Sequence, residues 1–231
     1  MTLPPTIALD GPAGSGKTTV AHAIATQLGY LLVDTGAFYR AVTLAALRAG
    51  VPISDSETLI ALAEQLQLET LWADGTDGNF YRLLLNGEDV SEAIRSAAVE
   101  DAVSQVAAVR GVRDVLNAGF RRLAETQPFV IMVGRDIGTV VLPEADLKIY
   151  LDAAPEVRAA RRGQQIGVAD QRDVQRALSQ RDQRDSQRAV APLRAAPDAH
   201  YIDTNRLDAQ AVIAHVQGLI TAWQVRHGSA T

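Results

Sequence analysis

Short apolar runs alternate with stretches of helical periodicity over the first fifty residues. Residues 7–9 form an apolar run within a first strand expected at residues 6–9. In residues 20–28, apolar side chains recur at the three- and four-residue spacing of a helix. A second apolar run at residues 30–33 is followed by another helical stretch, which Gly50 closes. This strand–helix–strand–helix order predicts a parallel sheet flanked by helices.

The pattern changes in residues 66–95. Residues 68–73 alternate between apolar and polar side chains, and residues 80–85 form a second extended run. The segment between them, residues 74–79, is rich in Asp, Gly and Asn, which predicts a turn and hence an antiparallel hairpin. Because a parallel α/β core does not contain such a hairpin, we expect residues 66–95 to form an insertion.

Apolar runs and helical periodicity then resume to the end of the chain. Residues 129–133 form the most apolar run, which predicts a central strand. Ser54 and Ser56 can cap a helix that ends near residue 66. Further helices are expected at residues 97–109, 112–124, 173–190 and 208–226 and from Pro155, and further strands at residues 145–151 and 199–202.

A phosphate-binding pattern lies between the first predicted strand and the first predicted helix. Residues 10–18 read D-G-P-A-G-S-G-K-T and contain G-x-x-x-x-G-K-[ST]. The glycines allow backbone N–H groups to surround phosphate oxygens, and the helix directs its positive end at them. We expect Lys17 to reach the β- and γ-phosphates and the Thr18 hydroxyl to bind Mg²⁺. The residues expected to bind ATP are Gly11, Pro12, Ala13, Gly14, Ser15, Gly16, Lys17, Thr18 and Thr19.

The basic residues are almost all arginine. The two lysines, Lys17 and Lys148, leave 20 arginines among 22 basic residues. Arginine suits the planar, bidentate recognition of phosphate, although a codon bias toward arginine is an alternative explanation. With so few lysines, a Gly-rich turn that matches the phosphate-binding pattern by chance is rare.

Composition narrows the class of protein. The chain has 231 residues, of which 47% are hydrophobic, enough for the core of one α/β domain. Its net charge of −5 argues against a general nucleic-acid or membrane surface. Because it has no cysteine, disulfides, thiolate nucleophiles and Cys-based metal sites are excluded. No signal-peptide pattern and no membrane-length apolar run is present, so we expect a cytoplasmic protein.

Polar residues follow several predicted strands at their carboxyl ends, where open α/β sheets bind ligands. Residues 34–40, D-T-G-A-F-Y-R, place Thr35 and Arg40 about one helical turn apart, where both could meet a second phosphate. Arg135 and Asp136 follow the most apolar strand. The ordinary alternatives are a capped helix with a surface arginine for the first segment and a structural ion pair for the second.

Two predicted helices carry several arginines. Arg158, Arg161 and Arg162 precede a Gly- and Gln-rich segment and could belong to a mobile lid over the phosphates, although a basic surface helix is the alternative. The spacing of four charged residues places them on one face of the next helix, which could equally be a solvated face of Arg–Asp pairs. These four residues are Arg181, Arg184, Asp185 and Arg188.

Taken together, these motifs resemble those of bacterial cytidylate kinases, which belong to the nucleoside monophosphate kinase family of P-loop proteins. The resemblance covers nearly the whole chain, and the motifs occur in the order found in that family. Besides residues 10–18 and 34–40, the motifs are V-S-Q-V-A at residues 103–107, G-R-D-I-G-T-V-V at 134–141, K-I-Y-L-D-A at 148–153 and R-D-Q-R-D-S-Q-R-A-V-A-P-L at 181–193.

The resemblance implies a three-layer α/β fold with a five-stranded parallel sheet flanked by helices and a small antiparallel β insertion. The kinase core would comprise residues 1–65 and 96–231, with a lid at about residues 155–172. The insertion, residues 66–95, would contribute to binding the monophosphate. The implied reaction transfers the γ-phosphoryl group of ATP to CMP or dCMP, with Mg²⁺ bound together with ATP. We expect a monomer with no nucleic-acid or membrane partner.

The resemblance also assigns roles to individual residues by their positions in the motifs. The family often has Ser at the position of Thr35. The implied roles are catalysis for Lys17, Arg158 and Arg162; binding of the acceptor phosphate for Thr35, Arg40, Arg135 and Arg188; recognition of cytosine for Ser104, Arg113 and Asp136; and binding of the sugar for Arg181 and Asp185.

Two other interpretations stay open at this point. A regulatory nucleotide switch would also bind phosphate in such a loop, but it is expected to carry an N-K-x-D guanine reader, and neither lysine lies in one. A UMP, AMP or shikimate kinase would share the fold and differ in the acceptor. An assay of ADP release across these acceptors separates the possibilities.

Overall fold

The computed structural model describes residues 3–72, 81–167 and 171–227. The chain divides into two compact units. The first unit comprises Met1–Val33 and Leu123–Thr231, and the second comprises Asp34–Arg122. The predicted turn at residues 74–79 and part of the predicted lid lie outside the described residues.

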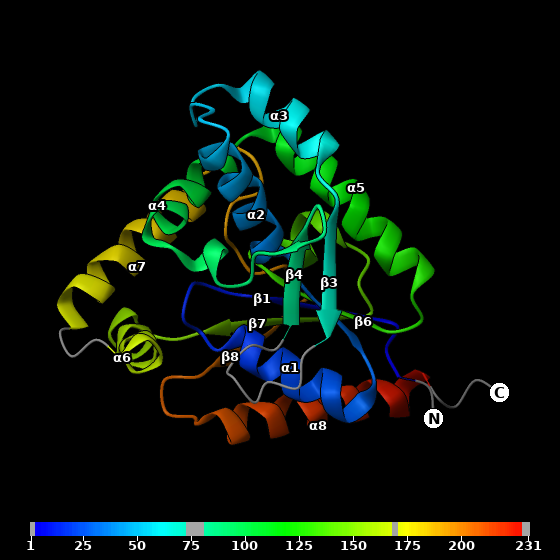
Figure 1. The fold of residues 1–231 in the computed structure, drawn as a ribbon. Coiled ribbons are helices and arrows are strands. Elements are labelled where there is room, and N and C mark those ends of the chain that lie inside the picture. The colour runs from blue at the N-terminus through cyan, green and yellow to red at the C-terminus, as the bar shows by residue number, and fades with distance from the viewer. Residues whose placement is uncertain (1–2, 73–80, 168–170, 228–231) are drawn as a thin grey trace. The chain divides into compact units, whose positions relative to one another are not determined.

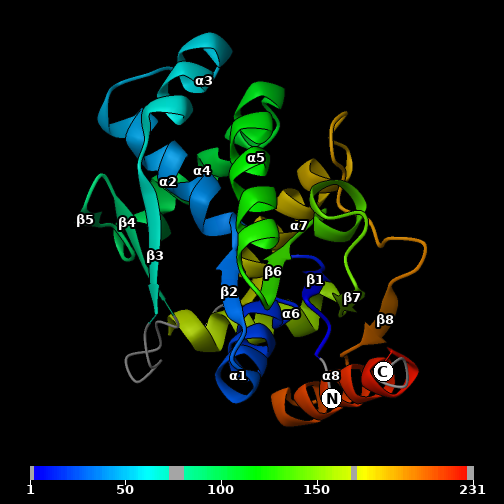
Figure 2. The same ribbon diagram turned by 90° about the vertical axis from the view of Figure 1, so that its right-hand side faces the viewer.

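A five-stranded parallel sheet runs through the first unit (Figures 1 and 2). The strands, in order across the sheet, are β2 (Leu31–Asp34), β6 (Val130–Gly134), β1 (Thr6–Asp10), β7 (Leu147–Asp152) and β8 (His200–Asp203). The five predicted strands are confirmed, although β1 rather than β6 lies in the middle. Every residue of β6 is buried, as is typical of a strand with both faces covered, and this explains its apolar sequence.

The strand register aligns the carboxyl ends of the central strands. Asp10, the last residue of β1, pairs with Gly134 of β6 and with Tyr150 of β7. The phosphate-binding pattern follows β1, and Arg135 follows β6. Both segments therefore start from the same edge of the sheet, where ligands of α/β proteins bind.

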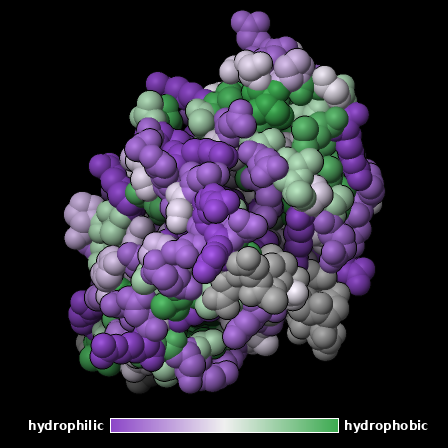
Figure 3. Space-filling view, turned by 90° about the vertical axis from the view of Figure 1, so that its left-hand side faces the viewer, coloured by the Kyte–Doolittle hydropathy of each residue, from purple (hydrophilic) through white to green (hydrophobic). Residues whose placement is uncertain are grey.

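The first unit contains four α-helices and one π-helical turn among its described residues. They are α1 (Lys17–Leu28), η2 (Ile137–Val141), α6 (Pro155–Ile166), α7 (Gln171–Ser186) and α8 (Ala209–His227). Helices α1 and α8 lie together on one side of the sheet in Figure 2. The surface over α6 and α7 is largely hydrophilic in Figure 3, which agrees with the polar sequence of α7.

The predicted end of the polar helix at residue 190 is wrong. Helix α7 ends at Ser186, and Ala191 has a left-handed φ of 53°. Pro192 follows and disfavours helical backbone at the residue before it. The Leu193 N–H instead donates to the Asp185 carbonyl at 2.9 Å and closes the helix end. Arg188 therefore lies beyond the helix and does not share its face.

Helices also dominate the second unit. They are α2 (Thr35–Arg48), α3 (Ser56–Gln65), the 3-10 turn η1 (Ala93–Arg95), α4 (Ala97–Val106) and α5 (Arg110–Thr126), the last of which continues into the first unit. The predicted serine cap of α3 is wrong. The side chain of Asp55 accepts hydrogen bonds from the backbone N–H and the hydroxyl of Thr58, because a carboxylate is as good a cap as serine.

The predicted hairpin is confirmed within the second unit. β3 (Leu68–Trp72) and β4 (Tyr81–Leu85) pair antiparallel, and β5 (Glu88–Asp89) adds a third strand that the sequence did not predict. Asn86 and Gly87 join β4 to β5 with φ of 50° and 83°, as a two-residue hairpin turn requires. Residues 66–95 lie wholly in the second unit, which extends beyond them on both sides.

No helix in the described part of the chain is long and apolar enough to cross a membrane.

Candidate active site

The phosphate-binding segment forms a tight loop between β1 and α1. Gly11, Gly14 and Gly16 have φ of 148°, 77° and 90°, values that residues with a side chain rarely adopt. A Cβ atom at Gly11 would lie 2.0 Å from the carbonyl oxygen of Leu151 in β7. The loop therefore starts so close to the neighbouring strand that only glycine fits there.

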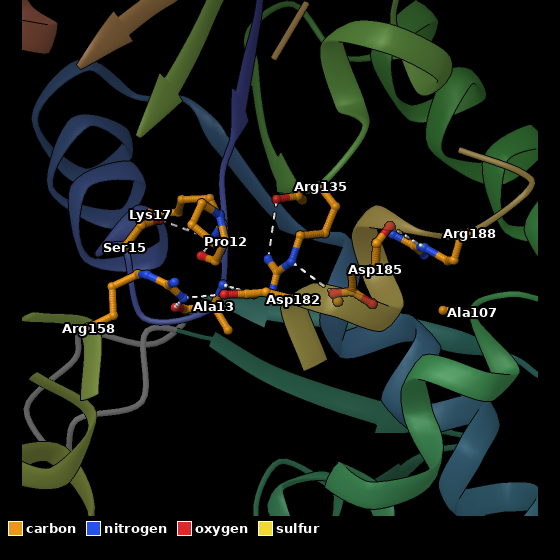
Figure 4. A network of polar contacts seen from close by, with 12 residues as sticks. Pro12, Ala13, Ser15, Lys17, Ala107, Arg135, Arg158, Asp182, Asp185 and Arg188 are labelled. Carbon is orange, nitrogen blue, oxygen red and sulfur yellow. Dashed lines mark hydrogen bonds and ion pairs between the residues drawn. The ribbon is translucent and has the colours of Figure 1, made fainter. Parts of the chain in front are cut away.

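Lys17 lies across this loop. Its Nζ donates hydrogen bonds to the Pro12 carbonyl at 2.7 Å and to the Ser15 hydroxyl at 3.3 Å, and its side chain is buried (Figure 4). Gly16, which precedes α1, supplies no side-chain cap to the first N–H groups of that helix. An ammonium group beside the start of a helix suits a phosphate.

Arg158, predicted to belong to a lid, contacts the loop directly. Its Nε donates to the Ala153 carbonyl at 2.8 Å, and its Nη1 donates to the Ala13 carbonyl at 2.9 Å and to the Asp182 carboxylate. Asp182, on α7, also accepts a hydrogen bond from the Ala13 N–H at 3.2 Å. Figure 4 shows these side chains gathered at the loop. Asp182 is absent from the predicted site residues, although it lies inside the motif at residues 181–193.

Helix α6 carries two other arginines, Arg161 and Arg162, besides Arg158. Arg161 donates to the hydroxyl and the carbonyl of Thr204 at 2.9 and 2.7 Å and to the Leu207 carbonyl at 3.1 Å. It therefore anchors the segment after β8 rather than facing the loop. Arg162 is partly exposed at the surface of the helix.

Asp10 is a second site residue that the sequence did not single out. Its two carboxylate oxygens accept hydrogen bonds of 2.8 Å from the N–H groups of Ile137 and Gly138, just after Asp136. Burial raises the pKa of Asp10 to about 6, and the two N–H groups partly oppose this shift. Asp10 thus ties the residue before the loop to the segment that follows β6.

Arg135 pairs with Asp185 and not with its chain neighbour, contrary to the ion-pair alternative. Its Nε donates to the carboxylate of Asp185 at 3.2 Å, and that carboxylate is almost fully buried (Figure 4). Arg188 donates from Nε to the backbone carbonyl of Asp185 at 3.2 Å. Asp136 is buried, whereas Arg181 is partly exposed and Arg184 is exposed. The first unit therefore brings Arg135, Asp185 and Arg188 together at the end of α7.

In the second unit, Arg40 is held by two acceptors. Its Nη1 donates to the Ile94 carbonyl at 3.1 Å, and its Nη2 donates to the Glu100 carboxylate at 2.8 Å. Thr35, the first residue of α2, is buried. The Asp34 side chain caps this helix, so the segment at residues 34–40 is a capped helix, as in the ordinary alternative, but its arginine is held in an ion pair.

The β insertion contributes one buried polar side chain to the start of α2. Tyr81 of β4 hydrogen-bonds to the carboxylate of Asp34, which also accepts from the Gly36 N–H at 3.1 Å. Burial and the nearby carboxylate raise the pKa of Tyr81 well above its usual value, so the phenol stays a neutral donor. No local sequence pattern indicates this contact, because it joins residues far apart in the chain.

Arg113 lies in the core of the second unit. Its side chain is 1% exposed, its Nη1 donates to the Ala107 carbonyl at 3.1 Å, and its guanidinium lies 5.3 Å from the centre of the Tyr39 ring. Ser104 is also buried. A fully buried arginine fixed by a carbonyl and a ring has a defined orientation, which a base reader needs.

The residues predicted for CMP binding therefore fall into two groups. Thr35, Arg40, Ser104 and Arg113 belong to the second unit. Arg135, Asp136, Arg181, Asp185 and Arg188 belong to the first unit, as do all the residues predicted to bind ATP.

The donor set suits a metal that is bound mainly by the nucleotide. Within the described residues, no group of three or more His, Cys, Asp or Glu side chains could hold a metal ion. Thr18, in the first turn of α1, offers a single hydroxyl. Mg²⁺ keeps several water or phosphate ligands and takes few from the protein, so this sparse set fits it.

Comparison with known proteins gives a consistent result. The family model described as cytidylate kinase matches residues 7–222. A cytidylate kinase from Nocardia farcinica is 46% identical over 98% of this chain and 97% of its own length. A cytidylate kinase from Pelotomaculum thermopropionicum is 44% identical over 94% of this chain and 96% of its own length.

Among solved structures, the fold resembles that of a gluconokinase from Sinorhizobium meliloti. The TM-score is 0.50 at 12% identity, over 98% of this chain and 99% of the gluconokinase chain. At that identity the likeness concerns the fold alone.

Proposed function

The chain belongs to the cytidylate kinase family, and on that premise we propose how its residues transfer the γ-phosphoryl group of ATP to CMP or dCMP. The products are ADP and CDP or dCDP. The observation that carries the proposal is the shared sheet edge: the phosphate-binding loop follows β1, and Asp136 follows the neighbouring strand β6.

The loop holds the phosphates of ATP. The N–H groups of residues 11–19 and the start of α1 surround the phosphate oxygens, and Lys17 exchanges its contact with the Pro12 carbonyl for the β- and γ-phosphates. A divalent metal accompanies ATP in such phosphotransfer. We propose Mg²⁺, held by the phosphates, water and the Thr18 hydroxyl, where it neutralises phosphate charge.

Cations hold the acceptor phosphate. Arg40 is one of these cations, and Thr35, at the start of α2, binds the phosphate with it. Arg135 and Arg188 are the others, and contacts with Asp185 fix both of their guanidinium groups. Planar guanidinium groups bind phosphate oxygens in pairs, so they orient the acceptor as well as neutralise it.

Three side chains read the base. The exocyclic N4 amine of cytosine is a donor, and a carboxylate is its natural partner, which Asp136 supplies. The Arg113 guanidinium and the Ser104 hydroxyl donate to the N3 and O2 acceptors. Uracil would present a carbonyl to the carboxylate and an N–H to the guanidinium, and a site with unpaired buried polar groups rejects such an analogue.

Asp185 accepts a hydrogen bond from a hydroxyl of the sugar, and Arg181 lies one helical turn before it on α7. The Asp185 carboxylate is held by Arg135, so sugar binding and phosphate binding share one ion pair.

No covalent intermediate or dedicated general base is required. Phosphoryl transfer depends mainly on positioning the two substrates and on neutralising the charge of the passing group. Lys17, Arg158 and Arg162 supply that positive charge. We further propose that the protein is cytoplasmic, since ATP and CMP are intracellular molecules, and that it acts as a monomer without nucleic-acid or membrane partners.

A coupled assay of ADP release tests the proposal. The purified chain is given Mg²⁺–ATP with CMP, dCMP, UMP, AMP or shikimate in turn. We expect rapid release with CMP and dCMP and slow release with the others. Rapid release with UMP, AMP or shikimate and slow release with CMP would overturn the assignment of the acceptor.

A further inference from the structure

One face of α7 packs against the phosphate-binding loop. Leu178 and Val174 of this helix pack with Ala13 of the loop and Ala159 of α6 in one apolar cluster. Asp182 lies four residues after Leu178, so helical spacing places it on the same face. The cluster fixes the distance between helix and loop and thereby brings the Asp182 carboxylate to the loop backbone.

Asp182 bridges three segments of the first unit. One carboxylate oxygen accepts the Ala13 N–H at 3.2 Å, and the other accepts Nη1 of Arg158 on α6 (Figure 4). Nη1 also donates to the Ala13 carbonyl at 2.9 Å. The carboxylate, the guanidinium and the backbone N–H and carbonyl of Ala13 therefore form a closed set of hydrogen bonds.

The same contacts determine which part of Arg158 can meet a substrate. Nε is committed to the Ala153 carbonyl, and Nη1 is committed to Ala13 and Asp182. In the part of the chain that the structure describes, no residue accepts a hydrogen bond from Nη2. Because Arg158 is only 5% exposed, its charge needs a compensating anion, which Asp182 supplies.

We propose that Asp182 is a positioning residue for phosphoryl transfer. It holds Arg158 against the loop so that Nη2 points its two N–H groups at the phosphoryl group that passes from ATP to the acceptor. The proposal rests on the proposed function in one respect, that Arg158 contacts the transferring group. Asp182 itself touches no substrate and acts only through Arg158.

A double-mutant cycle tests this role. The kcat with saturating ATP and CMP is measured for the unaltered protein, Asp182→Asn, Arg158→Ala and the double variant. We expect Arg158→Ala to lower kcat by about 10³-fold, as loss of an arginine in phosphoryl transfer does. Asp182→Asn should lower kcat by about 10- to 100-fold with the KM for CMP nearly unchanged. In the Arg158→Ala background, Asp182→Asn should change kcat by less than about twofold, because its target is gone.

A purely structural role for Asp182 predicts a different result. The two losses would then multiply in the double variant, and that outcome overturns the proposal, as does a kcat for Asp182→Asn within about twofold of the unaltered protein. Asp173→Asn is the matched control, because Asp173 is an exposed carboxylate on the same helix that pairs only with Arg176 among its described contacts. It should leave kcat unchanged.

A second variant covers a loss of folding. If Asp182→Asn melts below the assay temperature, Asp182→Glu replaces it, since this change keeps the charge and misplaces it by one methylene. A smaller loss of kcat is then expected, and it should again disappear in the Arg158→Ala background. Persistence of the loss in that background overturns the proposal.

Binding measurements separate this proposal from the proposed function. If the unaltered protein phosphorylates neither CMP nor dCMP, the proposed function fails, and the cycle is repeated on the ratio of the Kd for ADP to the Kd for ATP. We expect this preference for ATP to fall equally in Asp182→Asn, Arg158→Ala and the double variant. An unchanged preference in Asp182→Asn overturns the positioning role independently of the acceptor.

Discussion

The phosphate-binding loop and the predicted acceptor site are built in different ways. The loop is one continuous segment in which backbone N–H groups, left-handed glycines and Lys17 act together. The residues predicted to bind CMP come from separate segments of both units. The orientation of some of their side chains depends on ion pairs with other residues. Arg135 is held by Asp185, and Arg40 is held by Glu100.

This difference separates two kinds of functional loss. Damage to the loop removes stabilisation of the passing phosphoryl group and should lower turnover for every acceptor. Damage to an acceptor contact should change the KM for CMP or the choice of base and leave ATP binding intact. Measuring kcat and the KM for each substrate in single variants tests that separation.

Lys17→Ala should lower kcat by about 10³-fold or more with the fold retained, because the variant loses the ammonium group that stabilises charge on the transferring phosphoryl group. The coupled assay of ADP release measures it. Lys148→Met is the matched control, since Lys148 is the other lysine and pairs with Asp198 away from the loop. If Lys17→Ala keeps near-normal turnover, the loop is not the phosphate site.

Asp185→Ala should raise the KM for CMP by about tenfold or more and leave the KM for ATP within about twofold. The variant loses a buried acceptor for the sugar and the partner of Arg135. Initial rates with each substrate varied in turn measure the two constants. An equal rise in both would show that the end of α7 does not belong to the acceptor site alone.

Tyr81→Phe should raise the KM for CMP by about tenfold, because the Asp34 cap at the start of α2 loses one donor and a hydrogen bond to a carboxylate contributes about 1.5 kcal/mol. The KM for ATP should not change. Tyr30→Phe is the matched control, since Tyr30 is also buried and its hydroxyl donates to the Pro4 carbonyl at 2.7 Å within the first unit. A similar KM for CMP in both variants contradicts the link between the insertion and α2.

Asp10 gives the smallest expected effect, on stability. Its folded pKa of about 6 exceeds the ordinary 3.8, so the native state favours the protonated form. The contribution of Asp10 to the free energy of unfolding is fully present below pH about 3.8 and is lost as pH rises through 6. Asp136 raises this pKa and Lys17 lowers it, so both charges act on the same group.

Thermal melting of the unaltered protein and Asp10→Asn, at pH 7 and pH 5, measures that contribution. The unaltered protein should gain about 1 kcal/mol relative to the variant on acidification. A relative loss would mean that the two backbone N–H groups outweigh burial and hold the pKa below its ordinary value.

The sequence predicted the loop and the strands better than the contacts between elements. Residues 11–18 form a loop through their own backbone, so a local pattern is enough to predict it. The sequence did not predict a role for Asp10 or Asp182, because strand pairing and helix packing bring their partners, Ile137 and Arg158, to them. The residues around a carboxylate in a polar sequence do not indicate from which backbone N–H it will accept a hydrogen bond.

The end of a helix is also hard to predict from a local sequence pattern. The spacing of residues 181–188 suggested one continuous face, but α7 stops at Ser186 and places Arg188 beyond it. The stop follows from Pro192 and from the bond between the Leu193 N–H and the Asp185 carbonyl. The sequence contains this proline, but the polar periodicity of the residues before it led to a predicted helix end at residue 190.

The most direct test of the account is the ratio of kcat/KM for CMP to that for UMP, in the unaltered protein and in Asp136→Ala. Asp136 is the residue expected to distinguish an amine from a carbonyl at position 4 of the base. We expect a ratio of about 10³ or more in the unaltered protein, as for sites that pair with a polar group of the correct substrate. In Asp136→Ala the value for CMP should fall heavily and the ratio should approach about ten, with melting curves that confirm a folded protein. A folded variant that keeps both its CMP activity and its preference over UMP would contradict the account, because the base would then be read elsewhere.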